Sequence, residues 1–347
     1  MFFLGDIFIK LLNMSITATY VIIIIMAVRF LLKKFPKKYS YYLWGIVGFR
    51  LIFPFSITSE FSFLNLNTFT NINAGNYGME YIPSDIGFMD TPIIDVGIDS
   101  VNKMVNSLFP VSEIQNSINP MQIYILIAVI FWILGIIFIL VYEIFLFFRM
   151  KRVVKKAIFY KDNIYECDNI ETPFVIGFIK PKIYIPFRLN EKEFSYVLCH
   201  EKYHIKRYDN IIKIIAFFIL IVYWFNPFIW LAYFYMNKDM EMSCDEKVIL
   251  KMGVDSIKDY SYSLLSFAVN RRRLPFGPIA FGESYIRKRV KNILRFKKPK
   301  LWISIVGVLI VFIISVVCIT NKSESRDTYI TFTDNYETKK VVEKFFR

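Results

Sequence analysis

The chain has 347 residues, of which 55% are hydrophobic and 18% aromatic, and its formal net charge is +14. This composition is too apolar for an ordinary soluble domain and indicates an integral membrane protein. The positive charge lies in loops beside apolar runs, where it sets membrane orientation, and no helix-turn-helix motif stands out. Direct nucleic-acid binding is therefore the weakest of the alternative functions. Four cysteines without C-x-x-C spacing predict neither a disulfide framework nor a cysteine zinc cluster.

Four segments are predicted as transmembrane helices, at 5–32, 41–56, 121–148 and 300–320. The second is short and contains Arg50, a charged residue that is costly in the hydrocarbon core. The first two, which make up an N-terminal unit of residues 1–56, are joined by the turn KKFPKK. Its four lysines predict a cytoplasmic position.

The loops alternate in charge. Residues 57–120 hold one basic residue against seven acidic ones, which predicts an extracellular loop. Residues 149–299 follow the third span and are rich in lysine and arginine, which predicts a cytoplasmic domain beside an anionic leaflet. The N-terminus and the tail 321–347 are then expected to be external. No cleavable signal peptide is expected, because the first apolar run ends in lysines without a small-residue cleavage site.

One further apolar segment, 211–236, is long enough to span a membrane. If it crossed, the basic stretch 237–300 would lie outside, against the positive-inside rule. Asn226-Pro227 is a good breaking point, because proline disfavours helix at the residue before it. We therefore expect two helices, 211–225 and 227–245, in a hairpin that dips into the bilayer without crossing it. The backbone of the turn would be buried against protein. A simple transmembrane helix is the alternative.

Short β-type runs at 164–165, 174–176 and 182–185 predict a small hairpin-rich sheet. In zinc peptidases an edge strand beside the metal can pair with an extended peptide substrate, although such a sheet is often plain scaffold. Asn190 and Glu193 are spaced as a capping box for the helix that follows.

The sequence HEKYH contains His200, Glu201 and His204, and these two histidines are the only ones in the chain. Positions i and i+4 of a helix share a face, so both imidazoles can reach one zinc ion. Glu201 is rotated by about 100° around the helix, which keeps it off the metal but close enough to act as a general base on water. The motif predicts a zinc hydrolase with one Zn²⁺ per chain. The alternative is a solvated amphipathic helix that spells HExxH by chance.

A catalytic zinc normally has three protein ligands and a water. Glu241, at the end of the second hairpin helix, is the best candidate for the third, with Asp239 and Asp209 as rivals. Asp245, one turn after Glu241, could accept the second ring N–H of a ligating histidine. Asp239 and Asp209 are rivals for that role as well, and the alternative for either is a solvated charge or an ion pair with a nearby lysine or arginine. Cys244 could compete for the metal, although a packed or free thiol is the simpler reading.

Three runs of sequence carry a family resemblance: VLCHEKYHIKRYDN, YWFNPFIWLAYFYMNKDMEMSCDEKVI and AFGESYIRKRVKNIL. Together with the order of apolar segments over residues 1–320, they resemble membrane-embedded metallopeptidases of the BlaR/MecR antirepressor type. The resemblance implies zinc bound by His200, His204 and Glu241, with Glu201 as the base. The expected fold is a mainly α membrane protein with four transmembrane helices. Its cytoplasmic domain would be a gluzincin-like α+β zinc peptidase containing the membrane-dipping hairpin.

The best-known members of that family carry a penicillin-binding sensor domain after the last span. This chain departs from that pattern, because about 27 residues follow the span and contain no S-x-x-K motif. We therefore expect no direct β-lactam sensing by this chain. Family members also cleave themselves before the last span, which directs attention to the Arg-, Pro- and Gly-rich stretch 271–284. Its candidate self-cleavage residues are Ala280, Phe281, Gly282, Glu283 and Ser284. An ordinary basic loop lying against anionic lipid is the alternative.

The sequence thus predicts a multi-pass protein of a bacterial-type cell membrane that cleaves itself, a cytoplasmic transcriptional repressor, or both. The expected partners are the lipid bilayer, a small DNA-binding repressor as substrate and a second copy in a homodimer, with no direct nucleic-acid contact. Two alternatives remain: a catalytically silent membrane receptor or scaffold, and a membrane peptidase that processes lipidated proteins. A structural zinc site has no need of a base, so Glu201 disfavours the first.

Overall fold

The computed structural model describes residues 2–54, 57–58, 74–75, 78–110, 119–168, 170–177, 179–187, 189–269 and 283–321. Its α-helices are α1 Phe2–Leu31, α2 Lys37–Ile52, α3 Asp99–Asn106, α4 Pro120–Val154, α5 Glu191–Lys206, α6 Asp209–Val222, α7 Pro227–Met252, α8 Ile257–Val269, α9 Glu283–Leu294 and α10 Leu301–Ile319. Short 3-10 turns are η1 Leu32–Lys34, η4 Ile86–Phe88 and η5 Val254–Ser256. The strands are β1 Ile57–Thr58, β2 Ala74–Gly75, β3 Gly78–Met79, β4 Ile158–Lys161, β5 Ile164–Cys167, β6 Phe174–Ile176, β7 Lys182–Pro186 and β8 Thr320–Asn321.

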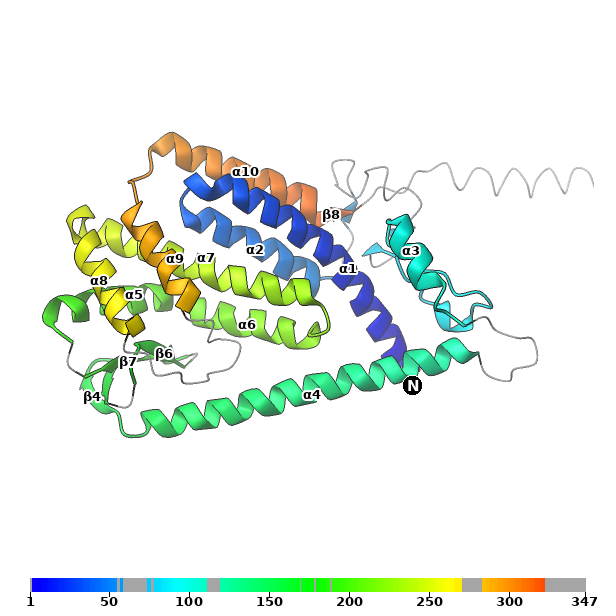
Figure 1. Cartoon of the computed structure of the whole chain (residues 1–347), viewed down its shortest axis with the longest axis horizontal. Helices are drawn as coiled ribbons and strands as arrows, with labels where there is room; N and C mark the ends of the chain where they lie inside the picture. Colours follow the sequence, from blue (N-terminus) through cyan, green and yellow to red (C-terminus); the bar gives the residue numbers. More distant parts are fainter. Residues whose placement is uncertain are drawn as a thin grey trace, which may run out of the picture.

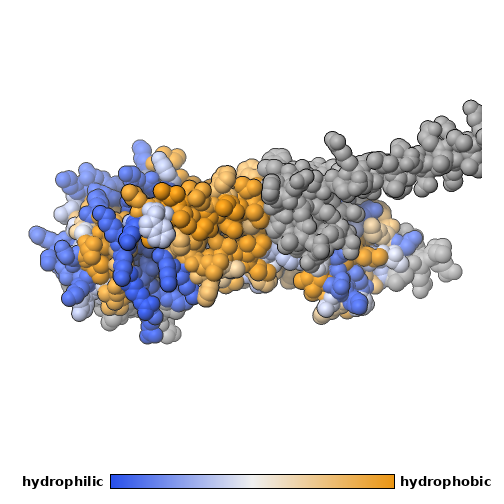
Figure 2. All heavy atoms as spheres, turned by 90° about the horizontal axis from the view of Figure 1, so that it is seen from above, coloured by the Kyte–Doolittle hydropathy of each residue, from blue (hydrophilic) through white to orange (hydrophobic). Residues whose placement is uncertain are grey.

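The described elements form an elongated, mainly helical molecule. Helix α2 packs against α1, α7 and α10, and α4 runs along the outside (Figure 1). The four-stranded sheet and helices α5, α8 and α9 lie at one end of the helices, and α3 lies at the other. Figure 2 shows an apolar band over the helices next to a polar end. Such a band matches the hydrocarbon layer of a membrane.

Three described helical segments are long and apolar enough to cross a membrane: Phe3–Lys34, Pro120–Val154 and Leu301–Ile319. They correspond to the first, third and fourth predicted spans. Helix α2, predicted as the second span, has 16 residues, so at 1.5 Å per residue it is about 24 Å long. That is shorter than a typical hydrocarbon core of about 30 Å. The count of four spans therefore remains a prediction.

Arg50 of α2 is buried, and its guanidinium contacts the end of α10. It donates hydrogen bonds to the carbonyls of Cys318 and Thr320, both at 2.7 Å. The last carbonyls of a helix have no partner within the helix and carry partial negative charge, so a cation stabilises them. Strand β1 pairs in parallel with β8 just beyond these two helix ends. The hydrogen bonds of Arg50 to the end of α10 thus explain why a charged residue lies in this apolar segment.

Helices α6 and α7 form a helical hairpin that breaks at Asn226-Pro227 as predicted, although α6 ends at Val222 and α7 continues to Met252. Asn226 caps α7 by accepting from Phe228 N, and its amide donates to the hydroxyls of Ser15 and Thr19 in α1. On the other side of the turn, the indole of Trp132 in α4 donates to the Val222 carbonyl at 2.8 Å. Polar groups of the turn are therefore satisfied by neighbouring helices, as an apolar environment requires.

Gly135 of α4 lets this turn approach closely. A Cβ atom at Gly135 would lie 2.2 Å from the indole ring of Trp224. We therefore expect Gly135→Ala to lower the free energy of unfolding by about 1–3 kcal/mol, because a packed indole must shift. Thermal unfolding of the two proteins in detergent measures this loss of stability. Gly48→Ala is the matched control, because nothing lies within 4 Å of that Cβ position in α2. An equal effect of both changes would contradict this account of the packing.

The predicted sheet is present, with strand order β4-β5-β7-β6. Its central pair, β5 and β7, is parallel, whereas both outer pairs are antiparallel, so the sheet is mixed rather than built only of hairpins. Ile164, Ile183 and Ile185 are buried from the sheet and pack with Val197 of α5. This hydrophobic contact positions α5, the helix that contains HEKYH, against the sheet.

Candidate metal centre

Helix α5 begins with the predicted capping box. The Asn190 side chain accepts from the Glu193 backbone N–H at 2.8 Å, and the Glu193 carboxylate accepts from the Asn190 N–H at 3.4 Å. Two unpaired donors at the helix start are thus satisfied, which favours a helix beginning here. The helix continues to Lys206, so His200 and His204 lie one turn apart on one face.

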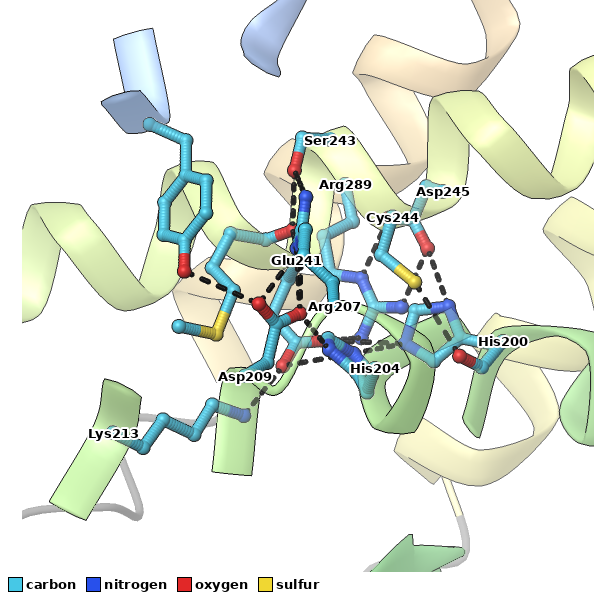
Figure 3. Close-up of polar contacts among 12 residues, drawn as sticks. His200, His204, Arg207, Asp209, Lys213, Glu241, Ser243, Cys244, Asp245 and Arg289 are labelled. Atoms are coloured by element: carbon cyan, nitrogen blue, oxygen red, sulfur yellow. Dashed lines mark hydrogen bonds and ion pairs between the residues drawn. The ribbon is translucent and has the colours of Figure 1, made fainter. Parts of the chain in front are cut away.

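The imidazoles of His200 and His204 are buried and converge on Glu241 of α7 (Figure 3). Their Nε2 atoms are 3.0 Å apart. The Glu241 carboxylate lies 3.3 Å from Nε2 of His200 and 3.6 Å from Nε2 of His204. Ligands around a tetrahedral zinc at 2.0–2.1 Å are about 3.3 Å apart. The three groups therefore have the spacing that one zinc ion requires.

Asp209 contacts the other ring nitrogen of His204, at 2.6 Å from Nδ1. A carboxylate only accepts, so Nδ1 carries a proton, and Nε2 is the nitrogen left facing Glu241. The guanidinium of Arg207 and the hydroxyl of Tyr41 also donate to Asp209. Tyr208, between α5 and α6, has a left-handed backbone with φ of 60°. A bulky residue rarely adopts this conformation, and here it provides the sharp turn that places Asp209 beside His204.

Tyr260 of α8 links His200 to Asp245. Its hydroxyl donates to Asp245 Oδ1 at 2.6 Å, and its oxygen is 3.0 Å from Nδ1 of His200. Because the hydroxyl proton is directed to the carboxylate, the tyrosine oxygen accepts from the His200 N–H. Asp245 itself is 3.3 Å from that nitrogen. Both histidines are thus held with Nδ1 protonated and Nε2 directed toward the shared centre, where a metal ion would displace any proton on Nε2.

The surroundings favour positive charge at this centre. Burial alone would lower the pKa of both histidines, but the acidic groups around them, Cys244 first, outweigh burial and hold each pKa well above its usual value. Burial would raise the pKa of Glu241, but Lys213 and the histidines hold it well below the usual range. A site that stabilises protons on two facing imidazoles also suits a divalent cation, which would take the place of those protons. The donor set therefore fits zinc.

Two cationic side chains reach the Glu241 carboxylate from other helices. Lys213 of α6 lies 3.0 Å from Oε1, and Arg289 of α9 lies 3.3 Å from Oε2. The base candidate, Glu201, is 8% exposed. Burial would lower the pKa of Lys213, but the charge of Glu241 and the hydrogen bond to it outweigh burial and hold that pKa above its usual value.

Cys244 offers a second type of donor. Ligand atoms of His200, His204 and Cys244 all lie within 4.8 Å of one another, and all three residues are buried. The Cys244 thiol is also 3.4 Å from the His200 carbonyl, to which it can donate. The centre therefore has two geometric candidates for a third ligand, the Glu241 carboxylate and the Cys244 thiolate.

Residues 9–293 match the family model described as BlaR1 peptidase M56. The chain belongs to this family. The chain is 30% identical over 127 residues to the methicillin resistance mecR1 protein of Staphylococcus aureus, covering 35% of this chain and 22% of that protein. It is 31% identical over 135 residues to the regulatory protein BlaR1 of Bacillus licheniformis, covering 37% and 22%. To the regulatory protein BlaR1 of Staphylococcus aureus it is 22% identical over 288 residues, covering 75% and 46%. Each match thus covers less than half of the relative's own length.

Membership in the M56 family makes this chain a membrane protein of a metallopeptidase family whose curated relatives include regulatory proteins. Of the acidic residues that the sequence analysis considered, Glu241, Asp209 and Asp245 lie at the centre. Asp239 does not contact it in the described structure. It is buried against Arg29 of α1, at 2.6 and 2.8 Å, and accepts from the Trp44 indole at 3.0 Å.

Five of the contacting residues were not singled out from the sequence: Tyr41, Arg207, Lys213, Tyr260 and Arg289. Tyr260 is one of 22 tyrosines, and nothing in its local sequence distinguishes it. Arg289 lies within one of the motifs that carried the family resemblance, which was the available signal. The candidate self-cleavage residues Ala280, Phe281 and Gly282 lie outside the described residues, and Glu283 and Ser284 are the first two residues of α9.

Proposed function

We propose that this M56 family member is a membrane-embedded zinc metalloendopeptidase that transduces a signal by cleaving itself, a cytoplasmic transcriptional repressor, or both. The observation that carries the proposal is the 3.0–3.6 Å spacing of His200, His204 and Glu241, with Glu201 next to the first histidine on the same helix. A structural metal site has no need of that glutamate.

In this proposal His200, His204 and Glu241 hold the metal. Asp209 keeps the His204 ring in the required tautomer, and Asp245 does the same for His200 through Tyr260. Zinc held by these residues would lower the pKa of water and polarise a peptide carbonyl. Glu201 takes the proton from the attacking water and passes it to the leaving amine.

We propose the following arrangement in the membrane: four transmembrane helices, external termini and a cytoplasmic peptidase domain. The lysine-rich turn after α1 and the basic composition of residues 149–299 support this orientation. The shape of the α6–α7 hairpin supports the proposal that it does not cross the membrane. Helix α7 returns to the end of the molecule at which α6 begins (Figure 1), and polar groups of its turn are satisfied by α1 and α4.

For the substrate, we propose a small DNA-binding repressor, the chain's own segment 271–284, or both. The regulatory names of the relatives support the first, and the Pro- and Gly-rich composition of the segment supports the second. Strand β6 lies at the sheet edge, and the Asn210 amide donates to Gly177 O at its end, next to Asp209. An extended peptide added along this edge would pass close to the metal centre.

One experiment compares three substrates for the purified, zinc-loaded protein: its own chain, a folded winged-helix repressor and a prenylated peptide. We expect repressor cleavage and a C-terminal fragment of roughly 65–75 residues from self-cleavage, because the Pro- and Gly-rich composition of 271–284 disfavours regular structure and an extended peptide suits a peptidase cleft. His204→Ala is the control that should yield no fragment. If the fragment forms equally in that variant, an outside protease makes it. Cleavage of only the prenylated peptide would indicate a processing peptidase instead, and no cleavage at all would favour a receptor or scaffold.

A further inference from the structure

Helix α9 contributes one side chain to the metal centre. The side chain of Arg289 is 12% exposed and makes a two-pronged contact with Asp245, with Nε at 2.8 Å from Oδ2 and the terminal NH2 nitrogen at 2.7 Å from Oδ1. Its remaining nitrogen, NH1, lies 3.3 Å from Glu241 Oε2. One planar guanidinium thus contacts two carboxylates at once (Figure 3), which the single ammonium of a lysine cannot do with the same geometry.

Each of these carboxylates acts on the centre by a different route. Glu241 faces the Nε2 atoms of both histidines directly. Asp245 acts through Tyr260, whose hydroxyl donates to Asp245 and whose oxygen accepts from Nδ1 of His200. Arg289 therefore sets the position of one proposed ligand and, through two intervening groups, the ring orientation of another.

The rest of α9 is built to hold Arg289 in place. Ile293 is fully buried with Val248, Ile249 and Tyr260, and Val290 is buried on the same helix. Arg287, two residues before Arg289, is exposed. The Asn292 amide also donates to Glu246 of α7 at 3.1 Å. The helix thus directs a single arginine into the site, while a neighbouring arginine faces away.

We propose that Arg289 is a positioning residue of the metal centre, so that the centre is completed by α9. This inference rests on the proposed zinc site. Only six residues, 295–300, join α9 to the apolar helix α10. The helix that carries Arg289 is therefore close in sequence to the last candidate span. The guanidinium acts here through its shape. Its charge by itself opposes metal binding, because like charges repel.

The test measures zinc affinity by chelator competition on the full chain in detergent, together with the absorption spectrum of the cobalt-substituted protein. We expect Arg289→Gln to weaken zinc binding about 10–100-fold, as loss of a group that orients metal ligands typically does, and to change the cobalt spectrum. Arg289→Lys should restore little of the affinity, because lysine lacks the planar fork. Arg287→Gln, an equal charge change on the exposed face of α9, should match the wild type.

Unchanged or tighter zinc binding by Arg289→Gln would overturn the inference. So would wild-type affinity in Arg289→Lys, which would show that charge alone suffices. Far-UV circular dichroism shows whether Arg289→Gln folds. If it does not fold, the zinc affinity of Arg289→Lys tests the inference instead. If the wild type binds no zinc, or if His204→Ala binds zinc as well as the wild type does, the proposed zinc site is wrong and the inference fails with it. If the wild type binds zinc in that way and the Arg289 variants match it, only the inference fails.

Discussion

Replacing Glu201 with alanine is expected to abolish peptide hydrolysis while zinc stays bound. The change removes the group that would take a proton from the attacking water, and general-base catalysis contributes about 10²–10⁴-fold to a rate. The neighbouring ligands keep their contacts, because Asp209 and Tyr260 hold the two histidine rings independently of Glu201. The measurement pairs metal content per chain with the rate of fragment formation and of repressor cleavage.

Two further variants make this result specific. His204→Ala should lose both zinc and activity, because it removes a ligand. Glu193→Ala is a control on the same helix, since it removes the capping carboxylate about two turns before Glu201 and should leave hydrolysis unchanged while costing some stability. Full peptidase activity in the Glu201→Ala protein would show that another group is the base or that the protein hydrolyses peptides by a different route.

The second large effect is expected at the third ligand, where Glu241 and Cys244 compete. Both lie on α7 and face the same pair of histidines. Glu241→Gln should lower zinc affinity by more than the roughly 10–100-fold typical of losing an outer contact, because it removes the charged ligand itself. Cys244→Ala should keep zinc and activity. The Glu241 oxygens already stand 3.3 and 3.6 Å from the imidazole nitrogens, whereas the thiol is directed at the His200 carbonyl.

The cobalt-substituted protein distinguishes the two arrangements independently of activity. A thiolate ligand produces an intense sulfur-to-metal charge-transfer band, and a carboxylate does not. We therefore expect no such band in the wild type. If the band is present and disappears in Cys244→Ala, while Glu241→Gln retains the metal, the third ligand is the thiolate and the assignment of Glu241 is wrong.

The features that depend on neighbours in the sequence could be predicted from the sequence alone. Two histidines four residues apart lie on one helical face wherever the helix is placed. The capping box at Asn190 and the break at Asn226-Pro227 are likewise set by residues within three positions of each other. The three long apolar helices follow from composition, because apolar runs of this length match the hydrocarbon core of a membrane.

The partners of the site were decided only by the tertiary structure. Arg289, Lys213 and Tyr260 come from α9, α6 and α8, and each reaches the centre because those helices pack around α5 and α7. Asp239 and Asp245 lie on the same helix with similar sequence surroundings, yet one pairs with Arg29 of α1 and the other with Arg289. Helical periodicity determines which residues share a face, but the element that covers that face depends on the packing of distant segments. The sequence alone therefore determined the motif and the apolar helices, whereas packing decided which charges surround the candidate metal centre.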